Sequence, residues 1–275
     1  MWILVNLLVM VGMLFVVPGG MDLLGTRVTK FWYAGAAAGS VSLWLPRGGW
    51  AAGLAVIYAL SVGVLFAYRR RLPLILLGIA AVALIAERAG HELFGFETGV
   101  LALTVAHFHF AGFAAALIAG LHRRISPGRL ADAAALTVPA GTLLVLIGYF
   151  TGEFVELAGA VVLTAGMWAV GWLTWRHARG GRYDRLTAVL LGISAVVLAA
   201  SMVLALSWAL GEATGLPHPS LGWMAATHGV ANALGFAVCG IVGWRRTPFR
   251  SGAIPLRAVV PSFREGPAHP TPGPR

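Results

Sequence analysis

Long apolar runs alternate with short polar breaks along almost the whole chain. Nine runs fit helices that cross a bilayer, because a spanning helix needs about twenty mostly apolar residues. The second run is the shortest, and its Gly35 and Gly39 have the spacing of close packing on a neighbouring helix, so a count of eight remains the alternative. The pattern predicts an all-α polytopic bundle of about nine spans. We place them near residues 2–18, 31–46, 50–68, 72–90, 98–121, 133–151, 154–175, 186–210 and 220–244.

Composition supports the same class. Of the 275 residues, 59% are hydrophobic and 11% are charged, against roughly 25% charged in a soluble domain. The ten Trp and 36 Gly also fit helices in lipid. The single cysteine, Cys239, excludes an internal disulfide and a cysteine-based metal cage.

Basic residues fall in every second connection, as the positive-inside rule requires of nine spans. The connections between them contain only Arg47 and Arg88. This distribution explains the net charge of +10 without a nucleic-acid partner. It predicts an external N-terminus, a cytoplasmic C-terminus and a multi-pass protein of the cytoplasmic (inner) membrane. The basic groups are Arg27 and Lys30; Arg69, Arg70 and Arg71; Arg123, Arg124 and Arg129; Arg176, Arg179, Arg182 and Arg185; and Arg245, Arg246 and Arg250.

After the last span the chain becomes polar and rich in proline. We therefore divide it into a transmembrane bundle over residues 1–246 and a disordered cytoplasmic tail over residues 247–275.

Polar side chains within the spans are candidates for a site, because ionisable groups in lipid are costly and usually face a bundle interior or a wet cavity. At 1.5 Å per residue, His107 and His228 lie roughly 13 and 12 Å from the predicted outer ends of their helices. His109 and Asn232 lie somewhat deeper, and Asn6 falls in the same outer half. We expect these groups to share one layer of the membrane.

The direction around each helix divides these groups. His228 and Asn232 are four residues apart and project from one face. His107 and His109 are two apart, about 200° around the helix, so one faces the site and the other a neighbouring helix. Because His107 continues a face with Thr104, we prefer His107 as the site member and keep His109 as a candidate binding residue.

Acidic residues gather at the predicted outer ends of the helices. Glu87 and His91 are four apart, and Glu153 and Glu156 are three apart, so each pair shares a face if the helix continues there. A carboxyl in apolar surroundings is a usable general acid, and a nearby imidazole can take or relay the proton. The same pairs also suit helix caps, solvated rims or structural hydrogen bonds.

Two stretches carry a family resemblance. TVAHFHFAG at 104–112 and ATHGVANALGFAVCGIVGW at 226–244 resemble the most recognisable motifs of the YndJ-like family of bacterial integral membrane proteins. The early segment NLLVMVGMLFVVP is similar to that family too. The resemblance spans residues 1–246 and implies no assigned activity.

The AHFHF segment also resembles the haem-ligating helix of haem–copper oxidase subunit I. The chain lacks the adjacent His-His pair of those oxidases, which argues against a binuclear centre. A single haem held by two histidines between the fifth and ninth helices remains an alternative.

These observations favour a membrane enzyme that acts on a lipid-soluble substrate, with an isoprenoid as one candidate, by acid–base chemistry such as cyclisation or isomerisation. Its pocket would open outward, with Glu87, Glu156, His107, His228 and Asn232 as catalytic candidates. We expect no metal or cofactor. One alternative is a transporter or lipid-binding protein; the other is a haem or metal protein of electron transfer. The candidate substrate-binding residues are Asn6, His91, His109 and Glu153.

Overall fold

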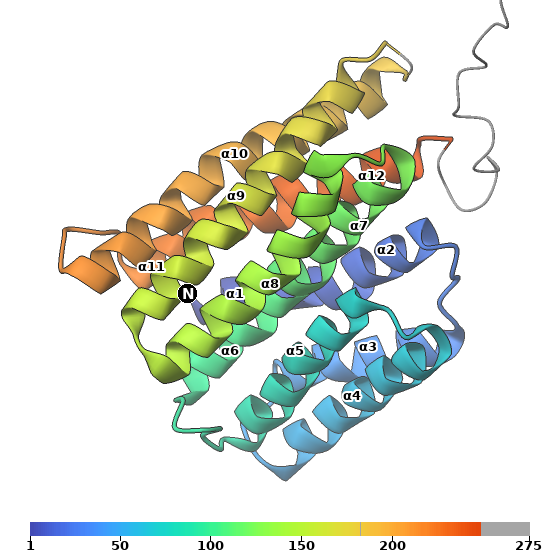
Figure 1. Ribbon diagram of the computed structural model, residues 1–275. Coiled ribbons are helices and arrows are strands. Elements are labelled where there is room, and N and C mark those ends of the chain that lie inside the picture. The colour runs from blue at the N-terminus through green and yellow to red at the C-terminus, as the bar shows by residue number, and fades with distance from the viewer. Residues whose placement is uncertain (182, 249–275) are drawn as a thin grey trace, which may run out of the picture.

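The computed structural model describes residues 1–181 and 183–248, and over these residues it is an all-α bundle of nine helical rods (Figure 1). The predicted tail from residue 249 onward lies outside the described residues. Six rods are single helices, and the other three continue through π-helical segments, labelled η. The first five rods are α1–η1–α2 (Trp2–Val11, Gly12–Val16, Val17–Leu23), α3 (Lys30–Ser42), α4 (Gly49–Arg69), α5 (Leu72–Ala89) and α6–η2–α7 (Thr98–His107, Phe108–Ala114, Ala115–Ile125). The last four are α8 (Arg129–Thr151), α9 (Glu153–Ala178), α10 (Arg185–Thr214) and α11–η3–η4–α12 (Leu221–Met224, Ala225–Gly229, Ala231–Val238, Cys239–Arg245).

Eight of the nine rods in the described chain are long and apolar enough to cross a membrane. The exception is α3, whose 13 residues extend about 20 Å, against a hydrocarbon thickness of about 30 Å. It still reverses the chain direction beside the first rod. Trp32 near its start donates to the Met13 carbonyl at 3.2 Å, and the Asn6 amide donates to the Leu43 carbonyl at its end at 2.9 Å.

Helix α3 ends four residues before the predicted boundary at residue 46. Its last carbonyls accept hydrogen bonds from side chains elsewhere in the chain, in place of the backbone N–H groups of a further helical turn. Arg88 Nη1 donates to the carbonyls of Ser42 and Leu43 at 3.1 and 3.3 Å, and Asn6 also reaches Leu43. These bonds satisfy groups that every helix end leaves free. In addition, Pro46 disfavours helical geometry in the residue before it.

The first rod extends five residues past the predicted end at Pro18. Proline has no N–H and its ring clashes with the carbonyl four residues earlier. The π-helical segment η1 lies directly before α2, where Pro18 occupies the first turn. Proline is tolerated at that position, so the rod continues to Leu23.

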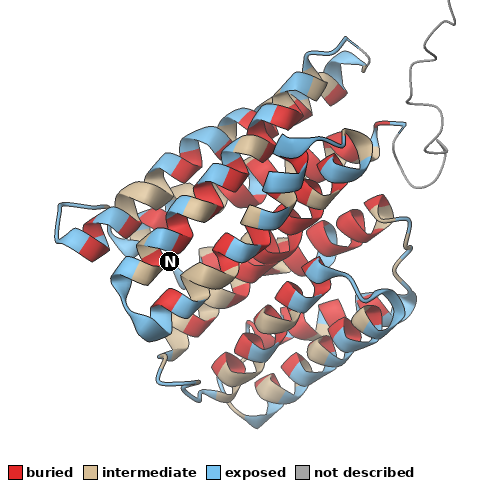
Figure 2. Ribbon diagram, viewed as in Figure 1, coloured by how far each residue is buried: buried red, intermediate tan, exposed pale blue. Residues whose placement is uncertain are grey.

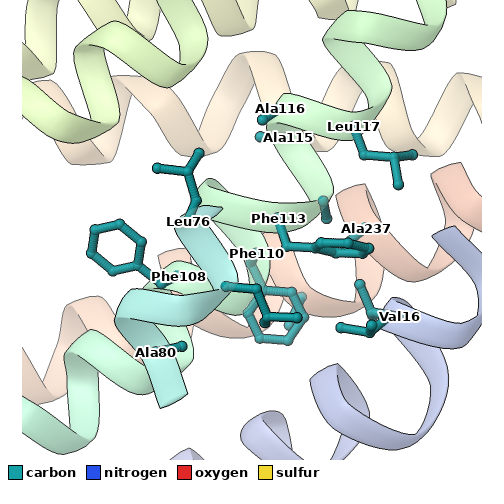
Figure 3. Close-up of a cluster of buried hydrophobic side chains, with 14 of the residues drawn as sticks. Val16, Leu76, Ala80, Phe108, Phe110, Phe113, Ala115, Ala116, Leu117 and Ala237 are labelled. Atoms are coloured by element: carbon teal, nitrogen blue, oxygen red, sulfur yellow. The ribbon is translucent and has the colours of Figure 1, made fainter. Parts of the chain in front are cut away.

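The centre of the bundle is formed by the three rods that contain π-helical segments. Segments η1, η2 and η4 contact one another. Figure 3 shows Val16, Phe110, Phe113 and Ala237 from these rods meeting in one apolar cluster, and the buried positions concentrate there (Figure 2). A Cβ on Gly12 would lie 2.8 Å from His109 Cδ2, so glycine permits this close approach.

Helices α3, α4 and α5 cover one side of this centre, and α8, α9 and α10 cover the other (Figure 1). The predicted glycine contact of the second span is confirmed, since a Cβ on Gly35 would lie 2.3 Å from Ser61 Oγ, and one on Gly39 would lie 2.9 Å from Tyr58 Cβ. Both partners belong to α4. A denser contact of the same kind joins α8 to α9, where a Cβ on Gly148 would lie 2.4 Å from Glu156 N.

Candidate functional site

A cavity of about 430 Å³ lies between the central rods and helices α8, α9 and α10. This volume falls within the range of small-molecule sites. Most of its lining is aliphatic or aromatic, from side chains such as Leu163, Met167, Met202 and Phe236. The polar or partly polar side chains on its wall are Thr104, His107, Thr142, Tyr149, Glu156, Trp208, Glu212, His228 and Asn232.

Small side chains leave the space open. Alanine and glycine line the wall at positions where larger side chains would meet across the bundle. Their side chains are too small to fill the volume between the helix backbones. The small residues of the lining are Ala106, Ala111, Ala160, Ala205, Ala209, Ala225 and Gly229.

His228 and Asn232 form one hydrogen-bonded unit with Ser201 of α10. His228 Nδ1 lies 2.8 Å from the Ser201 carbonyl, which only accepts, so Nδ1 is the donor. In the neutral ring Nε2 is then the acceptor, and Asn232 Nδ2 lies 3.3 Å from it. Asn232 accepts from Ser201 Oγ at 3.0 Å and donates from Nδ2 to the His228 carbonyl at 2.9 Å. The sequence prediction that both side chains project from one face agrees with this geometry.

His107 lines the same cavity and lies close enough to His228 for the two rings to interact electrostatically. Its Nε2 is buried and has no hydrogen-bond partner in the part of the chain that the structure describes. An unpaired buried polar atom costs free energy and calls for an explanation. A polar group of a bound molecule would supply the missing partner.

His109 faces the other way, as the helical angle predicts. Its Nδ1 lies 2.7 Å from the Val105 carbonyl, and its Nε2 lies 2.7 Å from the hydroxyl of Tyr58 on α4. The carbonyl makes Nδ1 the donor, so Nε2 accepts from Tyr58. Both nitrogens are therefore used within the protein. His109 does not line the cavity, which removes it from the candidate binding residues and leaves it no free nitrogen for a haem iron.

Two carboxyls of the cavity wall lie near helix ends. Glu156 is 7% exposed and lies in the first turn of α9, while Glu212 lies near the end of α10. Glu212 Oε1 also lies 3.2 Å from His218 Nε2 at the rim. Tyr149 belongs to the same end, where it packs edge-on against Phe96 with ring centroids 6.0 Å apart.

Glu87 takes a different place from the one predicted. It is 2% exposed but is not among the cavity-lining residues. Its carboxylate pairs with Arg88, and with Arg47 at 3.0 Å. Because Arg88 in turn holds the last carbonyls of α3, the Glu87 carboxylate fixes a helix end and is not in contact with the proposed site.

The remaining candidate binding residues also lie away from the cavity wall. Helix α5 ends at Ala89, and Gly90 follows in the left-handed region with φ 74°, so His91 does not continue the face of Glu87. Glu153 is exposed at the start of α9. Asn6 is used as the donor to Leu43.

Sequence reasoning missed several cavity residues. Glu212 was recognisable as an acidic residue at an outer helix end, at the same level as Glu156. Tyr149 and Trp208 carried no signal that separates them from ordinary interfacial aromatics. Ser201 could not be identified, because its main contribution is a backbone carbonyl that orients His228.

No three His, Cys, Asp or Glu side chains among residues 1–181 and 183–248 gather in a way that could hold a metal ion. The cavity therefore offers two imidazoles, an amide and two carboxyls in an otherwise apolar space.

Comparison with known proteins gives one match. The family model described as YndJ-like protein matches residues 7–72 and 70–236, which include the rods that form the cavity. No curated protein and no solved structure matches the chain.

Proposed function

The chain belongs to the YndJ-like family, and from this premise and the lining of the cavity we propose that it is a membrane-embedded enzyme of acid–base chemistry. Its substrate is a lipid-soluble molecule, of isoprenoid type, that is cyclised or isomerised. The observation that carries the proposal is the meeting of His107, His228 and Glu156 on one apolar cavity. These groups come from the fifth, ninth and seventh rods.

Each group has a chemical role in this proposal. Glu156 or Glu212 acts as general acid, because a carboxyl held among apolar side chains can deliver a proton to a bound substrate. The Nε2 atom of His228, whose orientation is fixed by the Ser201 carbonyl, acts as general base. His107 Nε2, which has no protein partner within the described chain, binds or receives a proton from the substrate.

Access follows from the position of the carboxyls. Tyr149, Glu156 and Glu212 lie near the ends of α8, α9 and α10, so we place the mouth of the cavity at this end of the bundle. The charge distribution predicts that this end faces outward from the cytoplasmic membrane.

Conversion of neutral lipids tests the proposal. Purified full-length protein in lipid nanodiscs is incubated with the neutral lipid extract of bacterial membranes, and products are separated by chromatography and mass spectrometry. We expect new isomers of unchanged mass with the wild type. Their yield should fall at least about 100-fold in His228→Ala, since general acid–base groups typically contribute 10²–10⁴-fold.

Glu153→Gln is the matched control, because this exposed carboxyl lies three residues from Glu156 and off the cavity wall. It should convert lipids as the wild type does. Extracts left unchanged by the wild type would contradict the enzyme proposal. Saturable uptake of a lipid into proteoliposomes, lost in His228→Ala, would then identify a transporter.

A further inference from the structure

The charge of the cavity wall restricts the substrate. Two carboxyls line the cavity, and no Arg or Lys is among the lining residues in the described part of the chain. The nearest outer-end arginines, Arg47 and Arg88, are paired with Glu87. One of the two carboxyls carries the proton that the reaction uses, so a phosphate or carboxylate brought into this space would meet the charge of the other without a counter-ion, which costs several kcal/mol.

The polar groups of the wall form two separate layers. Glu156 and Glu212 lie three and two residues from the ends of α9 and α10, or roughly 4 Å deep. His107 and His228 lie nine and seven residues from the starts of their rods, or roughly 12 Å deep. The charged groups that act on each residue show the same division. Glu156 is influenced by other carboxyls, whereas His107 is influenced by His228.

Counted along their own helices, the carboxyls and the imidazoles differ in depth by roughly 8 Å, which is more than the spacing of adjacent carbons. A proton that enters the substrate at the carboxyl layer and one that leaves at the imidazole layer must therefore belong to different parts of an extended chain. The wall also presents aromatic rings, including Phe108 and Trp208. Their faces attract a positive charge.

We infer that the substrate is an uncharged polyene that is cyclised by proton transfer, with the proton added at the carboxyl layer and another lost at the imidazole layer. This inference rests on the proposed function and gives its substrate class. A carboxyl proton forms a new C–H bond with an alkene carbon, and the resulting cation is attacked by the next double bond, which forms a C–C bond. Loss of a C–H proton to His107 or His228 forms the final double bond. The product is an isomer of the substrate, and the proton returns to the carboxyl through water after release.

A pair of ligands that differ in charge tests the substrate class. We use the full chain in nanodiscs with geranylgeraniol, which is neutral, and geranylgeranyl diphosphate, which carries the same hydrocarbon chain. Binding is followed by the shift in melting temperature with ligand concentration. We expect the diphosphate to bind at least about tenfold more weakly than the alcohol, because of the two carboxyls.

The double variant Glu156→Gln, Glu212→Gln should reduce the ratio between the affinities for the alcohol and the diphosphate. It removes the negative charge of the cavity wall and keeps the size of both side chains. Asp132→Asn, which changes an exposed carboxyl in the first turn of α8, at the other end of that helix from Tyr149, should leave the ratio of the two affinities as it is. Equal binding of both ligands, a preference for the diphosphate or no binding of the alcohol would each overturn the inference.

The proton-transfer step is tested in D₂O. A cyclic isomer formed from geranylgeraniol should carry one deuterium on carbon, at the chain end where cyclisation begins. A cyclic product without deuterium overturns the inference and leaves the enzyme proposal in place. Selective binding of the alcohol with no product contradicts the enzyme proposal, and with it the proton-transfer step, while the charge selectivity stands.

Discussion

His107 and His109 lie two residues apart on the fifth rod, and their surroundings give them different roles. His109 is fully buried and has hydrogen-bonded partners on both nitrogens, one of them Tyr58 on α4. His107 faces the cavity with its Nε2 unpaired within the described chain. The first joins two helices, whereas the second lines the cavity with a buried nitrogen that has no protein partner within the described chain.

This difference predicts opposite effects of the same substitution. His109→Leu leaves the buried Tyr58 hydroxyl without an acceptor, so the free energy of unfolding should fall by about 1–3 kcal/mol. His107→Leu removes an unpaired polar atom, so stability should be unchanged or higher while lipid conversion is lost. Thermal unfolding in detergent and the conversion assay measure the two effects. Loss of stability in His107→Leu with little change in His109→Leu would contradict these assignments.

Glu87 shows how a buried carboxylate serves structure. Its charge compensates the buried Arg88, which holds the end of α3. In Glu87→Gln the arginine keeps its charge without a partner, which typically costs about 3–5 kcal/mol. We expect that loss of stability in chemical unfolding.

The exposed pair Arg123–Asp132, at 2.9 Å, provides the control for Glu87. Asp132→Asn should change stability by no more than about 1 kcal/mol, because water screens exposed pairs. Full stability of Glu87→Gln together with lost lipid conversion would return Glu87 to the list of catalytic residues.

At the scale of elements, the helix positions were readable from apolar runs, but their ends were not. The second span ends early because Asn6 and Arg88, distant in sequence, cap its carbonyls. The π-helical segments left no pattern in the apolar runs, although they continue the first rod through Pro18. Local periodicity predicts which face a side chain occupies, whereas helix ends depend on tertiary contacts.

The contact between α8 and α9 places Glu156 at the cavity. In Gly148→Ala the new Cβ would lie 2.4 Å from Glu156 N, and backbone cannot yield as a side chain does. The helices must separate, so we expect a loss of about 1–3 kcal/mol and a lower yield in the lipid assay. Gly63→Ala on α4, which meets nothing within 4 Å, is the control and should be neutral or stabilising by up to about 1 kcal/mol. Equal losses of stability in Gly148→Ala and Gly63→Ala would mean that Gly148 is needed only for backbone flexibility and not for the close contact with α9.

The start of α10 has a pH-dependent cap. Asp184, just before the spanning helix, accepts from the Thr187 backbone N–H at 2.9 Å, and this bond lowers the pKa of its carboxyl. A lowered pKa in the folded state adds stability above the unfolded pKa of about 3.9, and that stability is lost as the pH falls. Asp184→Ala should therefore melt below the wild type at pH 7 and close to it at pH 3. A gap in melting temperature that is the same at both values would exclude the carboxylate as its cause.

At the scale of the whole molecule, the carboxyls of the cavity lie towards one end of the bundle, and the basic connections lie at the other. Glu153 and Glu212 lie at the first end. Arg69 and Arg123 lie in the last turns of α4 and α7, and Arg129 begins α8, on the opposite side. The alternation of basic connections along the sequence predicts this division, because each rod reverses the chain direction. The cavity itself could not be predicted, since it depends on how rods distant in sequence pack.

The orientation predicts which side of the membrane the cavity serves, and single cysteines test it. In a Cys239→Ala background, Glu153→Cys marks the mouth end and Arg129→Cys the basic end, and both positions are exposed. A membrane-impermeant maleimide should label Glu153→Cys in intact spheroplasts and Arg129→Cys only after permeabilisation, with Cys239→Ala itself as the unlabelled control. The reverse pattern would place the mouth in the cytoplasm. Labelling of both positions in intact spheroplasts would contradict the passage of the chain between them, because α8 (Arg129–Thr151) is long enough to cross the membrane once.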